Sequence, residues 1–255
     1  MKLATWNVNS IRIRIDRLLA FLARHEPDIV CLQEIKLVEE AFPLDAVHAA
    51  GYQAAVFGQK TYNGVAILSK HAATDVVRGF GDGVDDSHAR FLAARVDGVR
   101  VLDCYVPNGG EVGSDKWTYK LAWLERLARF LASHCDPAEP LVVCGDMNVA
   151  PEPRDVHDPA LWEPTVLYHP EARAALARVA AWGLEDVFRR HRDEPGLYSW
   201  WDYRMLAFPK NQGLRIDHVF ATPSFASRTT AASIDRDERK GKQPSDHAPV
   251  IVTYE

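Results

Sequence analysis

The sequence has few cysteines and no long apolar run, which argues against a disulfide-stabilised protein and against a membrane-spanning one. No segment of the 255 residues approaches the roughly 18 consecutive apolar residues that a membrane-spanning helix requires. The first ten residues, MKLATWNVNS, lack the apolar stretch of a secretory signal and begin a strand-like pattern at once. We therefore expect no membrane association and a cytoplasmic location.

The four cysteines have no spacing that indicates a metal site or a disulfide framework. Cys31, Cys104 and Cys144 each lie within an apolar, strand-like run, and Cys135 ends a helical one. No pair forms a CxxC motif. We interpret them as core thiols in a reducing compartment.

Repeats, low-complexity tracts and linkers are also missing, and there is no excess of basic charge. A hydrophobic content of 47% is sufficient for one sizeable core, so we expect a single domain over residues 1–255. The net charge of −5 gives no overall attraction to nucleic acid. A phosphodiesterase whose carboxylates bind cations would have a similar charge, so the basic residues must be considered individually.

Short apolar runs and amphipathic segments interleave along the whole chain. A helix with apolar residues at helical spacing is expected between Ser10, a possible cap, and Pro27. Two further helices are expected over 116–134 and 170–183, and strands over 2–8, 28–33, 52–58, 64–70, 141–144, 213–222 and 248–254. Residues 91–107 predict a hairpin around Asp97-Gly98, and 78–90 an irregular connection. This pattern favours an α/β (α+β) fold of two mostly antiparallel sheets packed face to face.

The segment Leu141–Pro153, LVVCGDMNVAPEP, carries polar groups at the end of an apolar strand. Asp146 and Asn148 are two residues apart, so in extended chain their side chains point to the same side. A site at the end of the strand is one reading. A turn in which both side chains bond their own backbone is the other, and the segment alone does not separate them.

Four more polar positions follow apolar strands: Asn7 with Asn9, Glu34, Tyr105 with Asn108, and Asp217 with Asp246-His247. If all five share one rim of the sandwich, four carboxylates meet in a single cleft. Such a cluster would repel itself unless a divalent cation lay among them. Magnesium, which prefers carboxylates, water and phosphate oxygens, suits such a site.

The residue types suggest a division of roles. Glu34, with Asn7 or Asn9, is suited to holding the metal, and Asp217 to fixing His247 so that its ring contacts a phosphate oxygen. Asp146 is suited to orienting or deprotonating a water molecule.

Asn148 and Tyr105 are neutral donors for oxygens that gain charge in the transition state. Each position has an ordinary structural alternative, such as a turn, a core tyrosine or a solvated carboxylate. Their joint occurrence predicts metal-assisted hydrolysis of a phosphodiester.

The chain resembles the exonuclease III / AP endonuclease family, which belongs to a superfamily that includes deoxyribonuclease I. The resemblance covers essentially the whole chain, through TWNVNSIR, LQEIK, NGVAILSK, YVPNGG, GDMNVAP, WWDYR, GLRIDH and SDHAPV. It implies a four-layered sandwich, in which two sheets are flanked by helices. It further implies metal binding by Asn7, Glu34 and Asp246, and catalysis by Tyr105, Asp146, Asn148, Asp217 and His247.

The resemblance also implies a substrate. Family members cut duplex DNA 5′ to abasic sites with Mg²⁺, for which Mn²⁺ can substitute, and many trim or unblock 3′ ends. The positions expected to bind substrate are Asn9, Asn108, Trp200, Asn211, Leu214, Arg215 and Ile216. Some relatives have Asp where this chain has Asn9, so a second metal position would be weaker here.

Trp200, Leu214 and Ile216 are expected to line a small apolar pocket that accepts a baseless sugar, and we expect one of Trp200 and Trp201 to be core. Candidate contacts to the DNA backbone are Arg12, Lys116, Lys120, Arg204, Lys210, Arg215 and Arg239–Lys242. We expect a monomer. Two alternatives are a superfamily phosphodiesterase acting on inositol phosphates or lipid head groups, and a DNA-binding module without catalysis.

Overall fold

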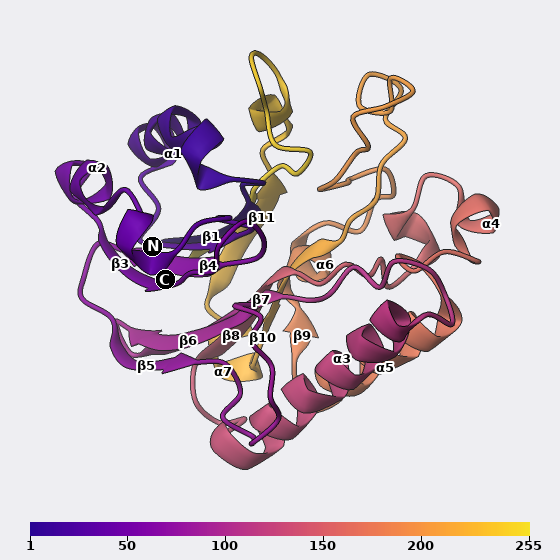
Figure 1. Cartoon of the computed structure of the whole chain (residues 1–255), viewed down its shortest axis with the longest axis horizontal. Coiled ribbons are helices and arrows are strands. Elements are labelled where there is room, and N and C mark those ends of the chain that lie inside the picture. Colours follow the sequence, from indigo (N-terminus) through magenta and orange to yellow (C-terminus); the bar gives the residue numbers. More distant parts are fainter.

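The computed structural model describes all 255 residues and contains two six-stranded sheets packed face to face (Figure 1). The first sheet has the order β11-β12-β1-β2-β4-β3 and contains β1 (Lys2–Asn7), β2 (Ile29–Gln33), β3 (Gln53–Phe57), β4 (Val65–Ser69), β11 (Thr229–Ile234) and β12 (Val250–Tyr254). The second has the order β5-β6-β7-β8-β10-β9 and contains β5 (Thr74–Arg78), β6 (Phe91–Val96), β7 (Val99–Tyr105), β8 (Leu141–Asp146), β9 (Glu185–Asp186) and β10 (Asp217–Ala221).

Helices cover the outer faces of both sheets, which completes the four layers (Figure 1). These are α1 (Ile11–His25) and α2 (Leu44–Ala49) on the first sheet, and α3 (Asp115–His134) and α5 (Pro170–Ala180) on the second. Two short helices, α6 (Val187–His191) and α7 (Pro223–Ala226), contribute side chains to the core between the sheets, and α4 (Pro159–Trp162) precedes α5 in the chain. Three 3₁₀ turns span Glu39–Ala41, Pro153–Asp155 and Arg236–Arg239. None of the helices is long and apolar enough to span a membrane.

The period-two alternation of the strands divides the core into layers. In β1, Leu3 packs between the sheets, whereas Ala4 faces α1. A third cluster joins the outer face of the second sheet to α3 and α5. Only the pairs β1–β2 and β7–β8 are parallel, so the expectation of two mostly antiparallel sheets is confirmed.

Of two local predictions, the hairpin over 91–107 is confirmed and the cap at Ser10 is not. The β6–β7 hairpin turns at Asp97-Gly98, and both residues have positive φ, as a primed turn requires. Ser10 occupies the N-cap position of α1, but its hydroxyl makes no capping bond, so that expectation is wrong. Its φ of 86° directs its backbone N–H to the Glu34 carbonyl instead, which joins the ends of β1 and β2.

Strand register places the polar positions of the second sheet side by side. Asp146 is the residue opposite Tyr105 in the parallel β7–β8 pair and opposite Asp217 in the antiparallel β8–β10 pair. In the first sheet, Asn7 aligns with Gln33, which directly precedes Glu34. The ends of β1, β2, β7 and β8 and the start of β10 therefore meet at one rim.

Candidate active site

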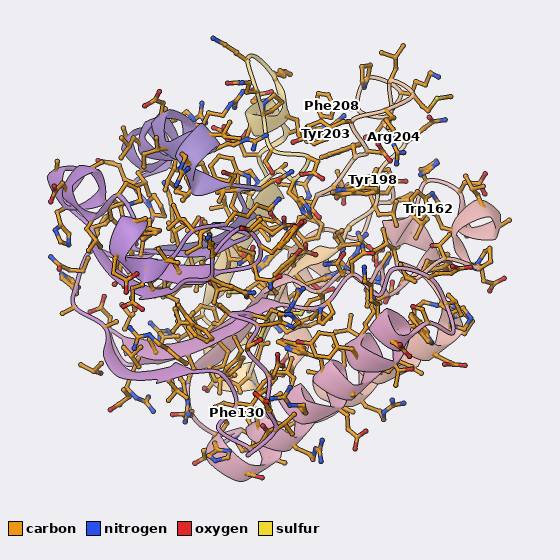
Figure 2. All side chains as sticks on the ribbon, in the orientation of Figure 1. Phe130, Trp162, Tyr198, Tyr203, Arg204 and Phe208 are labelled. Carbon is orange, nitrogen blue, oxygen red and sulfur yellow. The ribbon has the colours of Figure 1, made fainter.

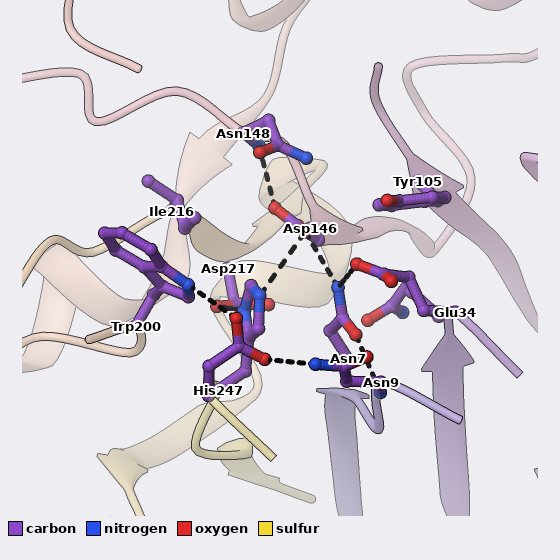
Figure 3. Close-up of polar contacts among 12 residues, drawn as sticks. Asn7, Asn9, Glu34, Tyr105, Asp146, Asn148, Trp200, Ile216, Asp217 and His247 are labelled. Carbon is purple, nitrogen blue, oxygen red and sulfur yellow. Dashed lines mark hydrogen bonds and ion pairs between the residues drawn. The ribbon is translucent and has the colours of Figure 1, made fainter. Parts of the chain in front are cut away.

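The acidic side chains predicted from strand ends converge at this rim (Figure 3). Single ligand atoms of Glu34, Asp146 and His247 lie within 4.8 Å of one another. Asn7 lies between the carboxylates, because its Nδ2 donates to Glu34 Oε1 at 2.8 Å and to Asp146 Oδ2 at 2.9 Å. The spatial prediction that underlies the proposed chemistry is thus confirmed.

A cavity of about 160 Å³ opens over these residues and has two unlike walls. Its acidic and polar wall contains Glu34, Tyr105, Asn108, Asp146, Asn148, Asp246 and His247. Its apolar wall contains Leu167, Trp200 and Ile216. The pocket therefore places charged groups, which could bind a cation or a phosphate, next to an apolar surface that offers no hydrogen bonds to a base.

His247 is oriented by a buried carboxylate. Its Nδ1 lies 2.8 Å from Asp217 Oδ2, which leaves Nε2 3.8 Å from Asp146 Oδ2. Burial alone would lower the pKa of His247, but Asp217 and Asp146 outweigh it and raise the pKa to about 10. The ring is therefore an imidazolium at neutral pH.

Asp146 lines the cavity but is almost fully buried. Its environment favours the uncharged, protonated form of the side chain. Burial raises its pKa to about 7, with a further contribution from Asp217 and Glu34 and an opposing one from His247. Its Oδ1 accepts the backbone N–H of Asn148 at 2.9 Å. A base that titrates near neutrality is well matched to proton transfer at physiological pH.

Asn148 and Tyr105 retain donors for a ligand. The Asn148 amide donates to the Val106 carbonyl and accepts from Asn108 Nδ2, which leaves one amide proton free. Burial raises the pKa of Tyr105, with Glu34 adding to the effect, so its phenol stays protonated. The Arg90 guanidinium stacks over the Tyr105 ring at 4.5 Å.

Asp246 and Asn9 contact each other at the side of the site. Asp246 accepts from Asn9 Nδ2 at 2.9 Å and from Trp200 Nε1 at 3.0 Å. Burial would raise the pKa of Asp246, but His247, Trp200 and Asn9 lower it, so it remains ionised. Asn9 Oδ1 accepts from Lys36 Nζ at 2.6 Å.

The donor set fits a hard divalent cation. Glu34, Asp146, Asp217 and Asp246 bring four carboxyl groups to one region, against the cations of His247 and Lys36. The ligand atoms of Glu34 and Asp146 face the same small space, and oxygen ligands are those that magnesium prefers. Asn7 offers its amide nitrogen to both carboxylates and thereby orients them.

Several expected substrate contacts have other partners in the structure. Leu214 is fully buried behind Trp200, with which it pairs through the backbone. Asn211 accepts from Trp201 Nε1 and donates to the Gly196 carbonyl, outside the cavity. Trp201 is fully buried, and Trp200 contributes to the cavity wall, as expected of one member of the pair.

Three of the expected DNA-backbone contacts are buried, which contradicts that role. Arg215 pairs with Asp155 and Asp186, and its Nη1 contacts His218. Lys120 and Arg239 donate to backbone carbonyls in the interior. The remaining candidates are exposed: Arg12, Lys116, Arg204, Lys210, Lys240 and Lys242.

Sequence reasoning missed four residues that build the site. Lys36 Nζ lies 2.8 Å from Glu34 Oε2, and Leu167 is part of the apolar wall. The Ser245 hydroxyl donates to the Asn7 carbonyl and accepts the His247 N–H. Ser199 Oγ accepts the N–H groups of Ile216 and Asp217. Lys36 and Ser245 belong to the quoted motifs LQEIK and SDHAPV, which was the available signal.

Comparison with known proteins agrees with this geometry. Residues 4–247 match the endonuclease/exonuclease/phosphatase family, and the chain belongs to that family. Exodeoxyribonuclease III of Haemophilus influenzae is 34% identical over 266 residues, which cover 100% of both chains.

Two solved structures narrow the class. An AP endonuclease from Archaeoglobus fulgidus has a TM-score of 0.97 and 39% identity, covering 100% of this chain and 99% of that one. The 3′ phosphatase NExo from Neisseria, bound to a product DNA hairpin, has a TM-score of 0.95 and 38% identity over 100% and 99% of the two chains. This protein is therefore a nuclease of the exodeoxyribonuclease III / AP endonuclease branch, with a candidate acidic metal site.

Proposed function

We propose that the protein is a magnesium-dependent DNA repair nuclease that cuts the backbone 5′ to abasic sites and also trims and unblocks 3′ ends. The observation that carries the proposal is the single pocket in which an acidic wall faces an apolar one. An abasic sugar lacks a base to stack, so moving it out of the duplex costs less than moving an intact nucleotide. Trp200, Ile216 and Leu167 would pack against such a sugar.

Glu34, with Asp246 at the side, would hold the cation, which when bound would polarise a phosphate oxygen. Asp146 would orient the attacking water and take its proton, because its pKa of about 7 leaves it ionised in a useful fraction of molecules. The His247 imidazolium, fixed by Asp217, would donate from Nε2 to a non-bridging oxygen. Asn148 and Tyr105 would donate to oxygens that gain charge.

The surroundings of the pocket support a duplex substrate. The segments around residues 200–212 and 235–247 project from the same end of the molecule (Figure 1), and Tyr203 and Arg204 lie on the first of them (Figure 2). Met205 is 80% exposed and Leu206 68% exposed, and both have positive φ. Apolar side chains on an exposed tip are suited to entering a minor groove, while the exposed Arg204 and Lys210 would contact phosphates.

The test uses a labelled duplex with one abasic analogue. With Mg²⁺, the wild-type protein should nick the strand 5′ to the lesion, EDTA should stop the reaction, and Mn²⁺ should restore it. Asp146→Asn should slow the single-turnover rate by about 10³-fold while binding the duplex normally, since it removes the base and keeps the shape.

Parallel assays on intact recessed ends and 3′-phosphate ends would measure the other two activities. Duplex binding without cleavage of any of the three substrates would favour a silent binding module. Cleavage of an inositol phosphate in place of DNA would overturn the proposed substrate. A mutant that cuts as fast as wild type would exclude Asp146 as the base.

A further inference from the structure

Lys120 is a fully buried lysine whose ammonium group donates hydrogen bonds only to backbone carbonyls. It lies in the second turn of α3, and its Nζ donates to Asn108 O at 3.0 Å, Asn148 O at 2.7 Å and Val166 O at 2.6 Å. An ammonium has three protons, so every donor is used. Lysine is rarely buried this completely without a carboxylate partner, and no ion pair involves this one.

The three carbonyls belong to three separate segments that each contribute to the catalytic cavity. Asn108 and Asn148 line it directly, and Val166 precedes Leu167 of the apolar wall. The segments are otherwise joined by the Val106 N–H to Asp146 O bond, by the Asn148 amide to Val106 and Asn108, and by Ala150 N–H to Leu167 O. Lys120 is the one side chain that donates hydrogen bonds to all three.

Asn148 has a backbone conformation that its neighbours help to hold. Its φ is 49°, in the left-handed region, which asparagine adopts more readily than most non-glycine residues. Conformations of this kind persist where surrounding bonds over-determine them. Lys120 holds the Asn148 carbonyl from the side of α3, and His218 Nε2 holds the next carbonyl, that of Val149, at 2.8 Å.

The aliphatic part of the Lys120 side chain passes through a space that a glycine leaves open. A Cβ on Gly109 would lie 2.9 Å from Lys120 Cδ and 3.3 Å from Val166 Cβ. Gly109 therefore leaves the space through which the side chain passes to reach the three carbonyls. Burial lowers the pKa of Lys120 to about 7, with Asp146 opposing the effect. Only the protonated form can satisfy three acceptors.

We propose that Lys120 is a positioning residue, which sets the spacing of Asn108, Asn148 and Leu167 around the substrate through their backbone carbonyls. The inference rests on the proposed function for its kinetic readout only. Because these residues act on the reacting phosphate and sugar, their displacement should affect the chemical step more than substrate binding. A displacement of about 1 Å is enough to cost up to ~10²-fold in rate.

The first experiment compares Lys120→Met with wild type on the abasic duplex. Methionine fills a similar volume without donating. We expect the single-turnover rate to fall about 10- to 100-fold while KM changes by less than about threefold. Arg129→Met, which removes an exposed cation from the same helix, should match wild type. NMR of the Asn148 side-chain amide should show a shift in Lys120→Met and none in Arg129→Met.

Gly109→Ala provides a second variant if Lys120→Met folds poorly. It keeps the ammonium but obstructs its stem, and its φ of 100° adds backbone strain directly after Asn108, so it should give at least as large a rate loss together with a shift of the Asn148 amide. Unchanged rates and an unmoved amide in both folded variants would overturn the inference. If wild type cuts no DNA, the proposed function fails, and the amide shifts alone still decide the role of Lys120.

Discussion

The two faces of β10 carry similar acidic groups with opposite electrostatic outcomes. On one face, Asp217 lies beside His247 and Asp146 under an open cavity. On the other, Asp155 and Asp186 are paired with Arg215, and Asp155 also with Arg189. The first cluster has more carboxylates than cations, so pKa values shift and a divalent ion fits. The second is balanced, so it closes into the interior. Both clusters are buried, so the number of cations that match the carboxylates, more than burial, distinguishes the candidate active site from the structural cluster.

The histidines of the two faces show the same contrast. His247 faces carboxylates, and its pKa rises to about 10 despite burial. His218, next to Asp217 in the chain, is equally buried, but burial and the Arg215 guanidinium lower its pKa to about 4. At pH 7 one ring is therefore charged and the other neutral.

Breaking the balanced cluster should have the largest effect on stability. Asp155 accepts from Arg215 at 2.7 Å and 3.1 Å and also pairs with Arg189. Asp155→Asn would leave two buried guanidinium groups, Arg215 and Arg189, with Asp186 as the one remaining carboxylate of the cluster, and should lower the free energy of unfolding at pH 7 by about 3–5 kcal/mol. Urea denaturation of both proteins measures this difference.

The effect should depend on pH in a defined direction. Burial would raise the pKa of Asp155, but Arg215 and Arg189 outweigh it and lower the pKa below its ordinary value. Its stabilisation is therefore complete above about pH 4 and is lost as pH falls through the folded-state pKa. Asp202→Asn, which disrupts an exposed pair with Arg204, should be neutral. Equal stability of Asp155→Asn and wild type at pH 7 would show that the balanced cluster contributes nothing.

In the unbalanced cluster, His247→Gln should reduce the rate of the reaction. Glutamine can donate a hydrogen bond but carries no charge, so the single-turnover rate on the abasic duplex should fall by about 10²-fold. His71→Gln, at an exposed histidine that also pairs with an aspartate, is the matched control and should leave the rate unchanged.

The pH profile of wild type tests the same point without mutation. Because the pKa of His247 is raised to about 10, the ring keeps its proton and the rate should not decline between pH 7 and pH 9. At limiting Mg²⁺, the rate should rise as pH passes about 7, where Asp146 becomes a carboxylate. A decline centred near pH 6.5, the ordinary value for histidine, would contradict the assigned protonation.

Site residues could be predicted from the sequence where their position depends on local properties of the chain, and not where it depends on partners distant in the sequence. Asp146, Asn148 and Tyr105 could be placed because pleat periodicity and strand ends are local properties, and register then brings them together. The burial of one tryptophan of the pair at 200–201 followed from similar reasoning.

Basic residues could not be placed in this way. Lys120, Arg215 and Arg239 have the same local pattern as exposed cations, and their burial depends on partners as distant as Val166, Asp155 and Trp201. Leu167 of the cavity wall lies in a turn without a periodic pattern. Only the tertiary structure supplies these contacts.

The smallest effect at pH 7 should come from His218, and it sharpens the comparison of the two histidines. Its Nε2 donates to the Val149 carbonyl and its Nδ1 accepts from Arg215. His218→Gln can retain one of these bonds, so unfolding at pH 7 should become easier by only about 1 kcal/mol.

At pH 5 the order should reverse. The pKa of His218 is lowered to about 4 in the folded protein. When the pH falls below the pKa of the unfolded chain, the unfolded chain binds a proton at this histidine and the folded protein does not. Wild type should thereby lose about 2 kcal/mol between pH 6.5 and pH 5, a loss that the glutamine variant escapes. Urea titrations of both proteins at the two pH values measure the crossing. If the deficit of the variant is the same at pH 5 as at pH 7, His218 is not held neutral, and the electrostatic contrast between the faces of β10 is wrong.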